Sequence, residues 1–292
     1  MRTLQTGVQG QTLRPVEDPP SRNLKTSTSN LDHVLVDDFI LRATGDRTVI
    51  NTPPVVLRFG NWLYLWLDAH QRTRAGERSA IVEAPGMDIW LEAFPALRGL
   101  TVPGDLVRFH DRREWDAETS WKQRFGLDFT RESLGAFIAD CLAPYLDSEE
   151  SGMLVVNIRR GDYYSKPVLR DRYGFDQLAY LRDAFGRAGR VDRTLIVSDD
   201  PEWCRENVLD LAAEISEVVE FAERDPVSNF KAVAAASLII DTNSTFTYWG
   251  AYIAGVLHPS PVVMMSRFHG RFPHWTDAYQ LDPRWIAIDG YF

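Results

Sequence analysis

Sulfur is scarce in this chain, and its scarcity excludes the folds and sites that depend on it. The 292 residues include only two cysteines, Cys141 and Cys204. Two thiols form neither a disulfide framework nor, by themselves, a zinc site. Cys204 falls within a helical pattern, which favours a buried thiol. The composition therefore indicates a protein of a reducing compartment.

Positive charge and long apolar segments are also lacking. The formal net charge is −9, whereas binding to nucleic acid rests on basic surface, so we expect no nucleic-acid partner. No apolar run reaches the roughly 18–20 residues that a transmembrane helix needs, and the N-terminus lacks the apolar segment of a signal peptide. We therefore expect a cytoplasmic protein without a transmembrane segment, either free or peripheral to the inner membrane.

Apolar residues, by contrast, make up 45% of the chain, which is enough for one large hydrophobic core or two modest ones. Residues 1–48 are polar and lack a clear periodicity, so they are interpreted as an N-terminal arm. An acidic stretch at 147–152 is typical of a boundary between domains. We predict one domain at 49–150 and a second at 151–292.

An α/β fold is predicted from the alternation of apolar strands and amphipathic helices, because this alternation favours parallel sheets. In the second half we expect strands at 153–158, 194–197, 218–221 and 237–240, and helices at 174–186, 202–215, 228–236 and 246–254. In the first half we expect strands at 55–57, 79–83 and 106–109, and helices at 62–74, 88–97 and 134–146.

Two adjacent arginines, Arg159 and Arg160, end the apolar strand at 153–158. Adjacent guanidiniums beside a buried strand are costly unless an anion meets them, and open α/β sheets bind ligands beyond the carboxyl ends of their strands. Side chains alternate along a strand, so one arginine is expected to face a ligand while the other braces the fold, with Asp162 as a candidate partner. A solvated strand exit is the alternative. The adhesion tripeptide Arg160–Asp162 is a weak match because it follows a core strand.

Two further turns carry polar groups at the start of a helix. Asn243, Ser244 and Thr245 lie between a strand and a helix, where free N–H groups and the helix dipole favour an anion. An ordinary Ser/Thr N-cap is the alternative. Gly60 and Asn61 start the helix at 62–74 and predict an anion or sugar site, with a simple turn capped by Asn61 as the alternative. Together with the arginine pair, the Asn243–Thr245 turn predicts a shared diphosphate site.

Four segments carry a resemblance to a known family: Arg58–Asn61, Ile158–Tyr163, Ser198–Asp200 with Trp203, and Asn243–Ala251. In this order and rough spacing they resemble the α-1,2-fucosyltransferases. The first segment also looks like the corresponding turn of protein O-fucosyltransferases. The resemblance covers about residues 55–261 and identifies the chain as a divergent member of the bacterial α-1,2-fucosyltransferases.

The resemblance implies a GT-B fold, in which two Rossmann-like domains with parallel sheets face each other across a cleft. It implies that residues 49–150 hold the acceptor and residues 151–292 hold the donor, GDP-fucose. Transfer would be inverting, onto a sugar hydroxyl such as the 2-OH of a galactoside, with no metal and no cofactor. The acceptor would be an oligosaccharide, a glycolipid or another glycoside.

The same resemblance implies roles for single residues. Arg159 matches the arginine that holds the donor β-phosphate, and Arg160 a supporting residue. Asp162 is a candidate general base by location, with capping of the turn or pairing with arginine as its alternative roles. The remaining donor-side positions are Asn157, Ser198, Asp199, Asn243, Ser244 and Thr245, of which Ser244 and Thr245 lie near the phosphates and Asp199 near the nucleoside. Gly60 and Asn61 lie close to the fucose or the acceptor.

Departures from the family pattern leave other functions open. The family has histidine where Asn157 stands, and asparagine donates a hydrogen bond but cannot carry a proton. The chain is therefore also compatible with another nucleotide sugar as donor, or with a degenerate GDP-sugar-binding protein. A manganese-dependent transferase using Asp199 and Asp200 is disfavoured, because these carboxylates are adjacent and Asp200 precedes Pro201 as a good helix cap.

Overall fold

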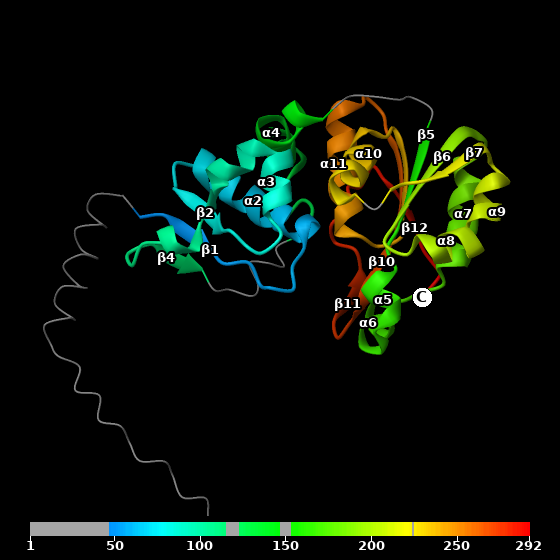
Figure 1. Ribbon diagram of the computed structural model, residues 1–292, viewed down its shortest axis with the longest axis horizontal. Helices are drawn as coiled ribbons and strands as arrows, with labels where there is room; N and C mark the ends of the chain where they lie inside the picture. Colours follow the sequence, from blue (N-terminus) through cyan, green and yellow to red (C-terminus); the bar gives the residue numbers. More distant parts are fainter. Residues whose placement is uncertain (1–46, 115–122, 147–152, 224) are drawn as a thin grey trace, which may run out of the picture. The chain divides into compact units, whose positions relative to one another are not determined.

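The computed structural model describes residues 47–114, 123–146, 153–223 and 225–292. Most of the predicted arm and the predicted boundary at 147–152 lie outside these residues. The described part is a mixed α/β structure with two parallel sheets (Figure 1), which confirms the predicted fold class. The division into domains at 150/151 stays a prediction.

The smaller sheet has the strand order β3-β2-β1-β4, and all of its pairs are parallel. Its strands are β1 (Val49–Asn51), β2 (Ser79–Val82), β3 (Thr101–Val102) and β4 (Arg112–Glu114). The helices of this half are α2 (Phe59–Arg74), α3 (Asp88–Ala93) and α4 (Arg131–Cys141), with 3-10 turns at Pro95–Leu100, Gly104–Leu106 and Ala143–Tyr145.

Two of the three strands predicted in this half are wrong. Val55 and Val56 lie in a turn and are 84% and 78% exposed, although β-branched residues favour strands. They follow Pro53 and Pro54, which have no N–H group for a sheet ladder. The strand predicted at 106–109 is also absent, because Leu106 ends a 3-10 turn and residues 107–109 are irregular. The nearby strand is β4 instead.

The larger sheet has the order β12-β9-β8-β5-β6-β7, again with parallel pairs throughout. Its strands are β5 (Met153–Ile158), β6 (Val191–Ser198), β7 (Ser216–Phe221), β8 (Leu238–Asp241), β9 (Val262–Ser266) and β12 (Ile286–Ile288). The four strands predicted in the second half are confirmed as β5 to β8.

Helices cover both faces of this sheet (Figure 1). On one face lie α7 (Gln177–Ala188), α8 (Pro201–Asn207) and α9 (Leu209–Ala213), and on the other α10 (Pro226–Ala235) and α11 (Thr245–Leu257). Alternate side chains of β5 pack against the helices on the two opposite faces of the sheet. Leu154, Val156 and Ile158 pack in the cluster that includes α7 and α8 residues, whereas Val155 packs with α10 and α11.

Two insertions flank the carboxyl ends of these strands. The segment after β5, expected to be a loop, forms the short helices α5 (Gly161–Ser165) and α6 (Pro167–Tyr173). A hairpin of β10 (Phe268–Phe272) and β11 (Trp275–Asp277) follows β9 and contacts α6. The insertions therefore lie next to the predicted arginine site.

Candidate functional site

The carboxyl end of β5 carries Arg159, whose guanidinium lies between two carboxylates. Its Nη2 is 2.6 Å from Asp162 Oδ1, and its Nη1 is 2.7 Å from Asp199 Oδ2. Burial opposes the charged form, but the two carboxylates outweigh it and raise the pKa of Arg159. The side chain is 33% exposed. Arg159 is thus a fixed cation that is still reachable from solvent.

Arg160 points to the opposite side and is packed into the fold. Its guanidinium lies 3.5 Å from the ring centre of Trp203 and 4.0 Å from that of Tyr164. It also contacts Asp200 at 3.3 Å and donates to Gln177 at 3.0 Å. Arg160 therefore braces the fold, and its partner is Asp200 rather than Asp162. That Arg159 faces a ligand stays a prediction.

Asp199 closes the turn between β5 and α5. Its Oδ1 accepts the backbone N–H groups of Arg160 and Gly161 at 2.7 and 3.0 Å. A Cβ atom on Gly161 would lie 2.4 Å from Asp199 Oδ2, so the missing side chain permits this contact. Ser198 joins the same junction by donating to the carbonyl of Ile158 at 2.8 Å. Ser198, the last residue of β6, and Asp199 after it therefore hold the exit of β5 in place.

The carboxyl end of β8 is buried and densely hydrogen-bonded. Asn157 Nδ2 donates to Asp241 at 3.1 Å, so this N–H is directed to a buried carboxylate. Asn243 donates to the carbonyls of Tyr173 and His269, each at 3.1 Å. Ser244 occupies the N-cap position of α11, yet its hydroxyl makes no capping bond, so the alternative of an ordinary cap is wrong.

The first turns of α2 and α11 lie side by side. A Cβ atom on Gly60 would be 2.6 Å from Thr245 Oγ1 and 2.7 Å from Phe246 N. One turn further along, the ring centres of Tyr64 and Trp249 are 5.0 Å apart. The helices therefore run in the same direction with their N-termini together, so their positive dipole ends add at one place.

Asn61 is not the cap of α2. The helix begins at Phe59, with Arg58 as its N-cap residue, so Asn61 lies within the first turn. Its Oδ1 accepts from Gln123 at 3.0 Å, and Gln123 in turn accepts from Gln280 at 2.9 Å. Sequence reasoning missed both glutamines, because they lie in irregular segments and follow no motif.

The model of glycosyl transferase family 11 matches residues 107–282. The chain belongs to glycosyl transferase family 11. The resemblance predicted from the four segments is therefore confirmed for the family. The matched range includes every predicted site residue in or directly after β5, β6 and β8 but excludes Gly60 and Asn61.

The chain is similar to galactoside alpha-(1,2)-fucosyltransferase 1 of Saimiri sciureus and of Lagothrix lagotricha, each 32% identical over 141 residues. The matched part is 46% of this chain and 37% of each relative, so the chain matches well under half of their length. A structure of POFUT1 in complex with GDP covers 76% of this chain and 99% of that chain, with 12% identity and a TM-score of 0.37, which is too low to assign a fold.

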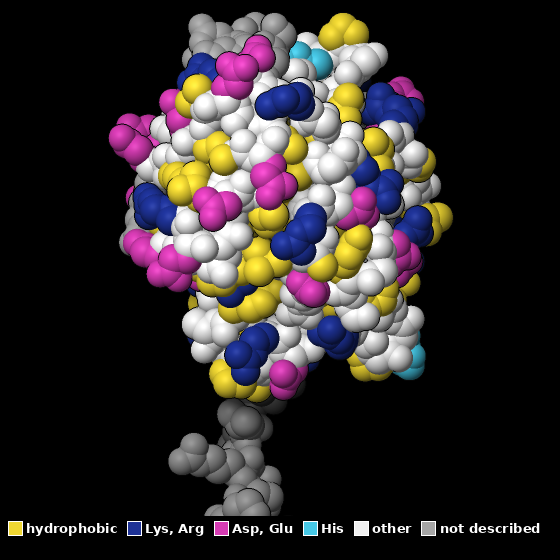
Figure 2. Space-filling model, turned by 90° about the vertical axis from the view of Figure 1, so that its right-hand side faces the viewer, with side chains coloured by type: hydrophobic (Ala, Val, Ile, Leu, Met, Phe, Trp, Pro, Cys, Tyr) yellow, Lys and Arg dark blue, Asp and Glu magenta, His cyan; other side chains and the backbone are white. Residues whose placement is uncertain are grey.

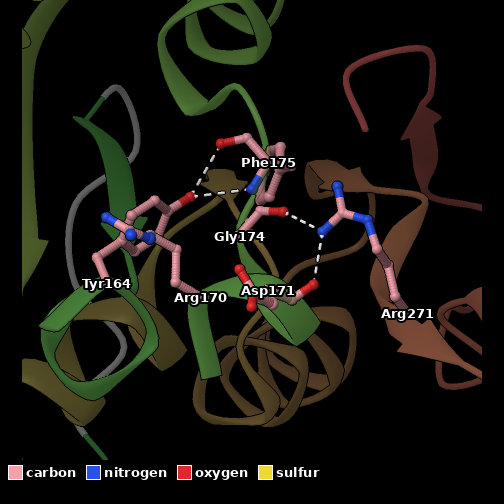
Figure 3. Close-up of a pocket in the computed structure, with 6 residues that line it drawn as sticks. All are labelled: Tyr164, Arg170, Asp171, Gly174, Phe175 and Arg271. Atoms are coloured by element: carbon pink, nitrogen blue, oxygen red, sulfur yellow. Dashed lines mark hydrogen bonds between the residues drawn. The ribbon is translucent and has the colours of Figure 1, made fainter. Parts of the chain in front are cut away.

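A pocket of about 490 Å³ is lined by residues of α5, α6 and β10, near the candidate site (Figure 3). Arg271 Nη1 donates to the carbonyls of Asp171 and Gly174 at 3.1 and 2.7 Å, and the Tyr164 hydroxyl donates to that of Phe175. Tyr164, which lines the pocket, also packs on Arg160. None of the predicted site residues lines the pocket, and its lining was not predicted from sequence.

Carboxylates that could hold a metal ion do not cluster in the described part of the chain. No group of three or more His, Cys, Asp or Glu side chains has a suitable arrangement there. Asp199 and Asp200 are each within ion-pair distance of an arginine, and Asp200 caps α8 through the N–H of Trp203. Among the described helices, none is long and apolar enough to cross a bilayer.

Proposed function

We propose that this protein is an inverting glycosyltransferase that moves fucose from GDP-fucose to a hydroxyl of a saccharide acceptor, without a metal ion. The observation that carries the proposal is the contact between Gly60 and Thr245, which puts two helix N-termini beside the strand ends that bear Arg159. Membership of family 11 and the fucosyltransferase relatives support the donor and the reaction. The proposal includes a GT-B arrangement, with residues 49–150 on the acceptor side.

The chemistry needs fixed positive charge at the leaving group. The acceptor oxygen forms a bond to C1 of fucose while the bond from C1 to the diphosphate oxygen breaks, and GDP leaves with the electron pair. Arg159 and the N–H groups at the start of α11 would stabilise that charge without reorganising, which is commonly worth about 10²–10³ in rate per donor. Ser244 and Thr245 would contact the phosphates, and Asp199 would lie near the nucleoside.

The ion pairs of Arg159 refine the role of its neighbours. Asp162 lies 2.6 Å from the guanidinium, so we assign it to orienting Arg159, the pairing role that was one of its predicted alternatives. The acceptor proton then leaves to another base or to the departing diphosphate. Asn157 donates to Asp241, so we assign it an indirect part in donor binding.

Charge on the surface agrees with a small anionic donor rather than a polyanion. On the face drawn in Figure 2, Lys and Arg side chains are interspersed with Asp and Glu. A nucleic acid would need a continuous basic surface, whereas a diphosphate needs only the local cation and N–H groups described above. We therefore propose a nucleotide-sugar donor and a saccharide acceptor as the partners.

The test combines binding with transfer. GDP should raise the melting temperature more than UDP does, and transfer to a panel of galactosides should persist in excess EDTA. Arg159→Ala should lose transfer by about 10²-fold or more, whereas Arg187→Ala should not, because it removes only a surface pair with Asp183. Protection by UDP but not by GDP would overturn the donor assignment.

A GDP-sugar-binding protein without transferase activity is the second candidate. It is favoured by one observation, that Asp162 and Asp199 already neutralise Arg159. Tight GDP binding with neither transfer nor hydrolysis of GDP-fucose, across the same acceptor panel, would establish it.

A further inference from the structure

The last residue of β8, Asp241, is a fully buried carboxylate at the centre of the candidate site. Its exposed fraction is 0%, and it is the direct neighbour of Asn157 in the register of β8 with β5. Its Oδ1 accepts from Asn157 Nδ2 at 3.1 Å, and its Oδ2 accepts from the backbone N–H of Ser244 at 2.9 Å. One side chain thus joins a central strand to the residue before α11.

The next residue, Thr242, continues this connection. Its N–H donates to the carbonyl of Asn157 at 3.3 Å, and its Oγ1 accepts the N–H of Arg159 at 3.1 Å. From the opposite face of the sheet, the Tyr180 hydroxyl of α7 donates to the carbonyl of Asp241. The backbone of Arg159 and the start of α11 are therefore both tied to one buried dipeptide.

Such a carboxylate is costly for the fold. Removing a charged group from water costs several kcal/mol unless it is paired, and the hydrogen bonds from Asn157 and Ser244 come from neutral groups. Burial is the largest influence and raises its pKa to about 7. An apolar residue at position 241 would be buried at a lower cost in free energy. The presence of a carboxylate there must therefore be explained by the hydrogen bonds that it accepts.

That pattern cannot be supplied by an apolar side chain in the same place. Two N–H donors, from Asn157 and Ser244, meet the side chain, and its oxygens accept both. An alanine would leave both donors unpaired, whereas an asparagine would keep both bonds once the Asn157 amide turned to present its oxygen. The carboxylate therefore fixes the β5 exit and the α11 start at a single separation.

We propose that Asp241 is a positioning residue for the transfer reaction, which sets the separation between Arg159 and the first turn of α11 so that both hold one leaving diphosphate. Asn157 is its matched partner rather than a phosphate ligand. This inference rests on the proposed function and deepens it.

Removal and conservative replacement of the carboxylate test the inference. Asp241→Ala leaves both donors unpaired. Asp241→Asn keeps both bonds, because its amide donates to the Asn157 oxygen once that amide turns over and accepts from the N–H of Ser244. We expect Asp241→Ala to weaken GDP binding and to lower kcat by on the order of 10²-fold, the usual effect of a misplacement near 1 Å. Asp241→Asn should retain most of both, with the acceptor KM unchanged throughout.

The controls separate positioning from folding. Melting temperature and circular dichroism are recorded for each variant, and Asn157→Ala serves as a milder change that keeps the carboxylate bond to Ser244. If Asp241→Ala or Asn157→Ala lowers only the melting temperature, with GDP affinity and kcat intact, the positioning role is overturned. A folded Asp241→Asn variant that loses as much GDP affinity and kcat as Asp241→Ala overturns it as well. Wild-type protein that binds UDP instead of GDP refutes the donor assignment. GDP-dependent wild-type transfer that is equally fast in all three variants refutes this inference alone.

Discussion

Gly60 of α2 lies against Thr245 of α11 so closely that a methyl group on Gly60 would be 2.6 Å from the threonine Oγ1. Nearby, Tyr64 and Tyr252 bring their hydroxyls to 3.4 Å. Residues far apart in sequence thus meet at the place where these two helices start together. This contact brings the first turn of α2 next to the start of α11, directly after β8 of the larger sheet.

The substitution Gly60→Ala should therefore separate the two helix starts. Backbone and threonine atoms lie under 3.0 Å from the added methyl group, so the helices have to move apart, at a cost of about 1–3 kcal/mol. Urea denaturation should show this loss, and transfer should fall with it. Gly135→Ala is the matched control, because no atom lies within 4 Å of its added Cβ and alanine favours a helix. Equal behaviour of the two variants would contradict the close contact.

The two arginines should respond oppositely to substitution. Arg160 is 12% exposed and lies between Trp203 and Tyr164, so Arg160→Ala should destabilise the protein by about 1–3 kcal/mol, as expected for breaking a buried pair of charge and rings. Arg160→Lys should recover little of this stability, because the space between the two rings fits a planar guanidinium and not an ammonium group. Arg159→Ala should leave stability nearly unchanged while abolishing GDP binding. Denaturation and isothermal titration of each variant distinguish these outcomes, and a reversed pattern would exchange the roles assigned to the two residues.

Four of the six strands of the larger sheet, β5 to β8, were predictable because each is marked locally, whereas β9 and β12 were not predicted. The apolar run of β5 ends abruptly in two arginines, and β8 ends in Asp241 and Asn243, so composition alone places polar groups at the carboxyl edge. Val55 and Val56 misled the prediction, since local preference for a strand was overridden by the prolines before them. Hydrophobic periodicity and composition predict poorly the secondary structure of short segments, because tertiary contacts determine their conformation.

Pairings across the chain were beyond the sequence. The turn at Gly60 was singled out, but its contact with Thr245 depends on how α2 packs on α11. Similarly, Asn157 was expected to face the donor, whereas its amide bonds to Asp241 because β5 and β8 are neighbours in register. Side-chain direction at a strand end depends on the neighbouring strand, which a single sequence does not name.

Asp241 and His269 should change the free energy of unfolding in opposite directions as the pH rises. Burial raises the pKa of Asp241 from 3.8 to about 7, so the folded state keeps a proton that the unfolded chain has lost, and the free energy of unfolding falls as pH rises from 4 to 7. Burial lowers the pKa of His269 from 6.5 to about 4, so the unfolded chain binds a proton first and the free energy falls as pH drops from 6.5 to 4. In Asp241→Asn only the histidine slope remains.

Urea denaturation between pH 4 and 7.5 measures both slopes. When the pH falls from 7.5 to 4, the free energy of unfolding of Asp241→Asn should decrease by about 3 kcal/mol more than that of wild type. A pKa difference of this size between the folded and unfolded states implies such a value. His269→Gln should show the reverse difference. Parallel curves for wild type and Asp241→Asn would mean that the carboxylate titrates near its ordinary pKa in the fold.

A final prediction concerns Asp199 and Gly161, because the Asp199 carboxylate occupies the space where a side chain on Gly161 would lie. A methyl group on Gly161 would be 2.4 Å from Asp199 Oδ2, the atom that holds Arg159 Nη1 at 2.7 Å. Gly161→Ala should push this carboxylate aside, release one of the two ion pairs of Arg159 and weaken GDP binding. In the Asp199→Ala background the same methyl group meets no carboxylate, so adding it should change GDP binding little. A double-mutant cycle by isothermal titration measures this coupling, and additive effects would show that the two residues act on the donor independently.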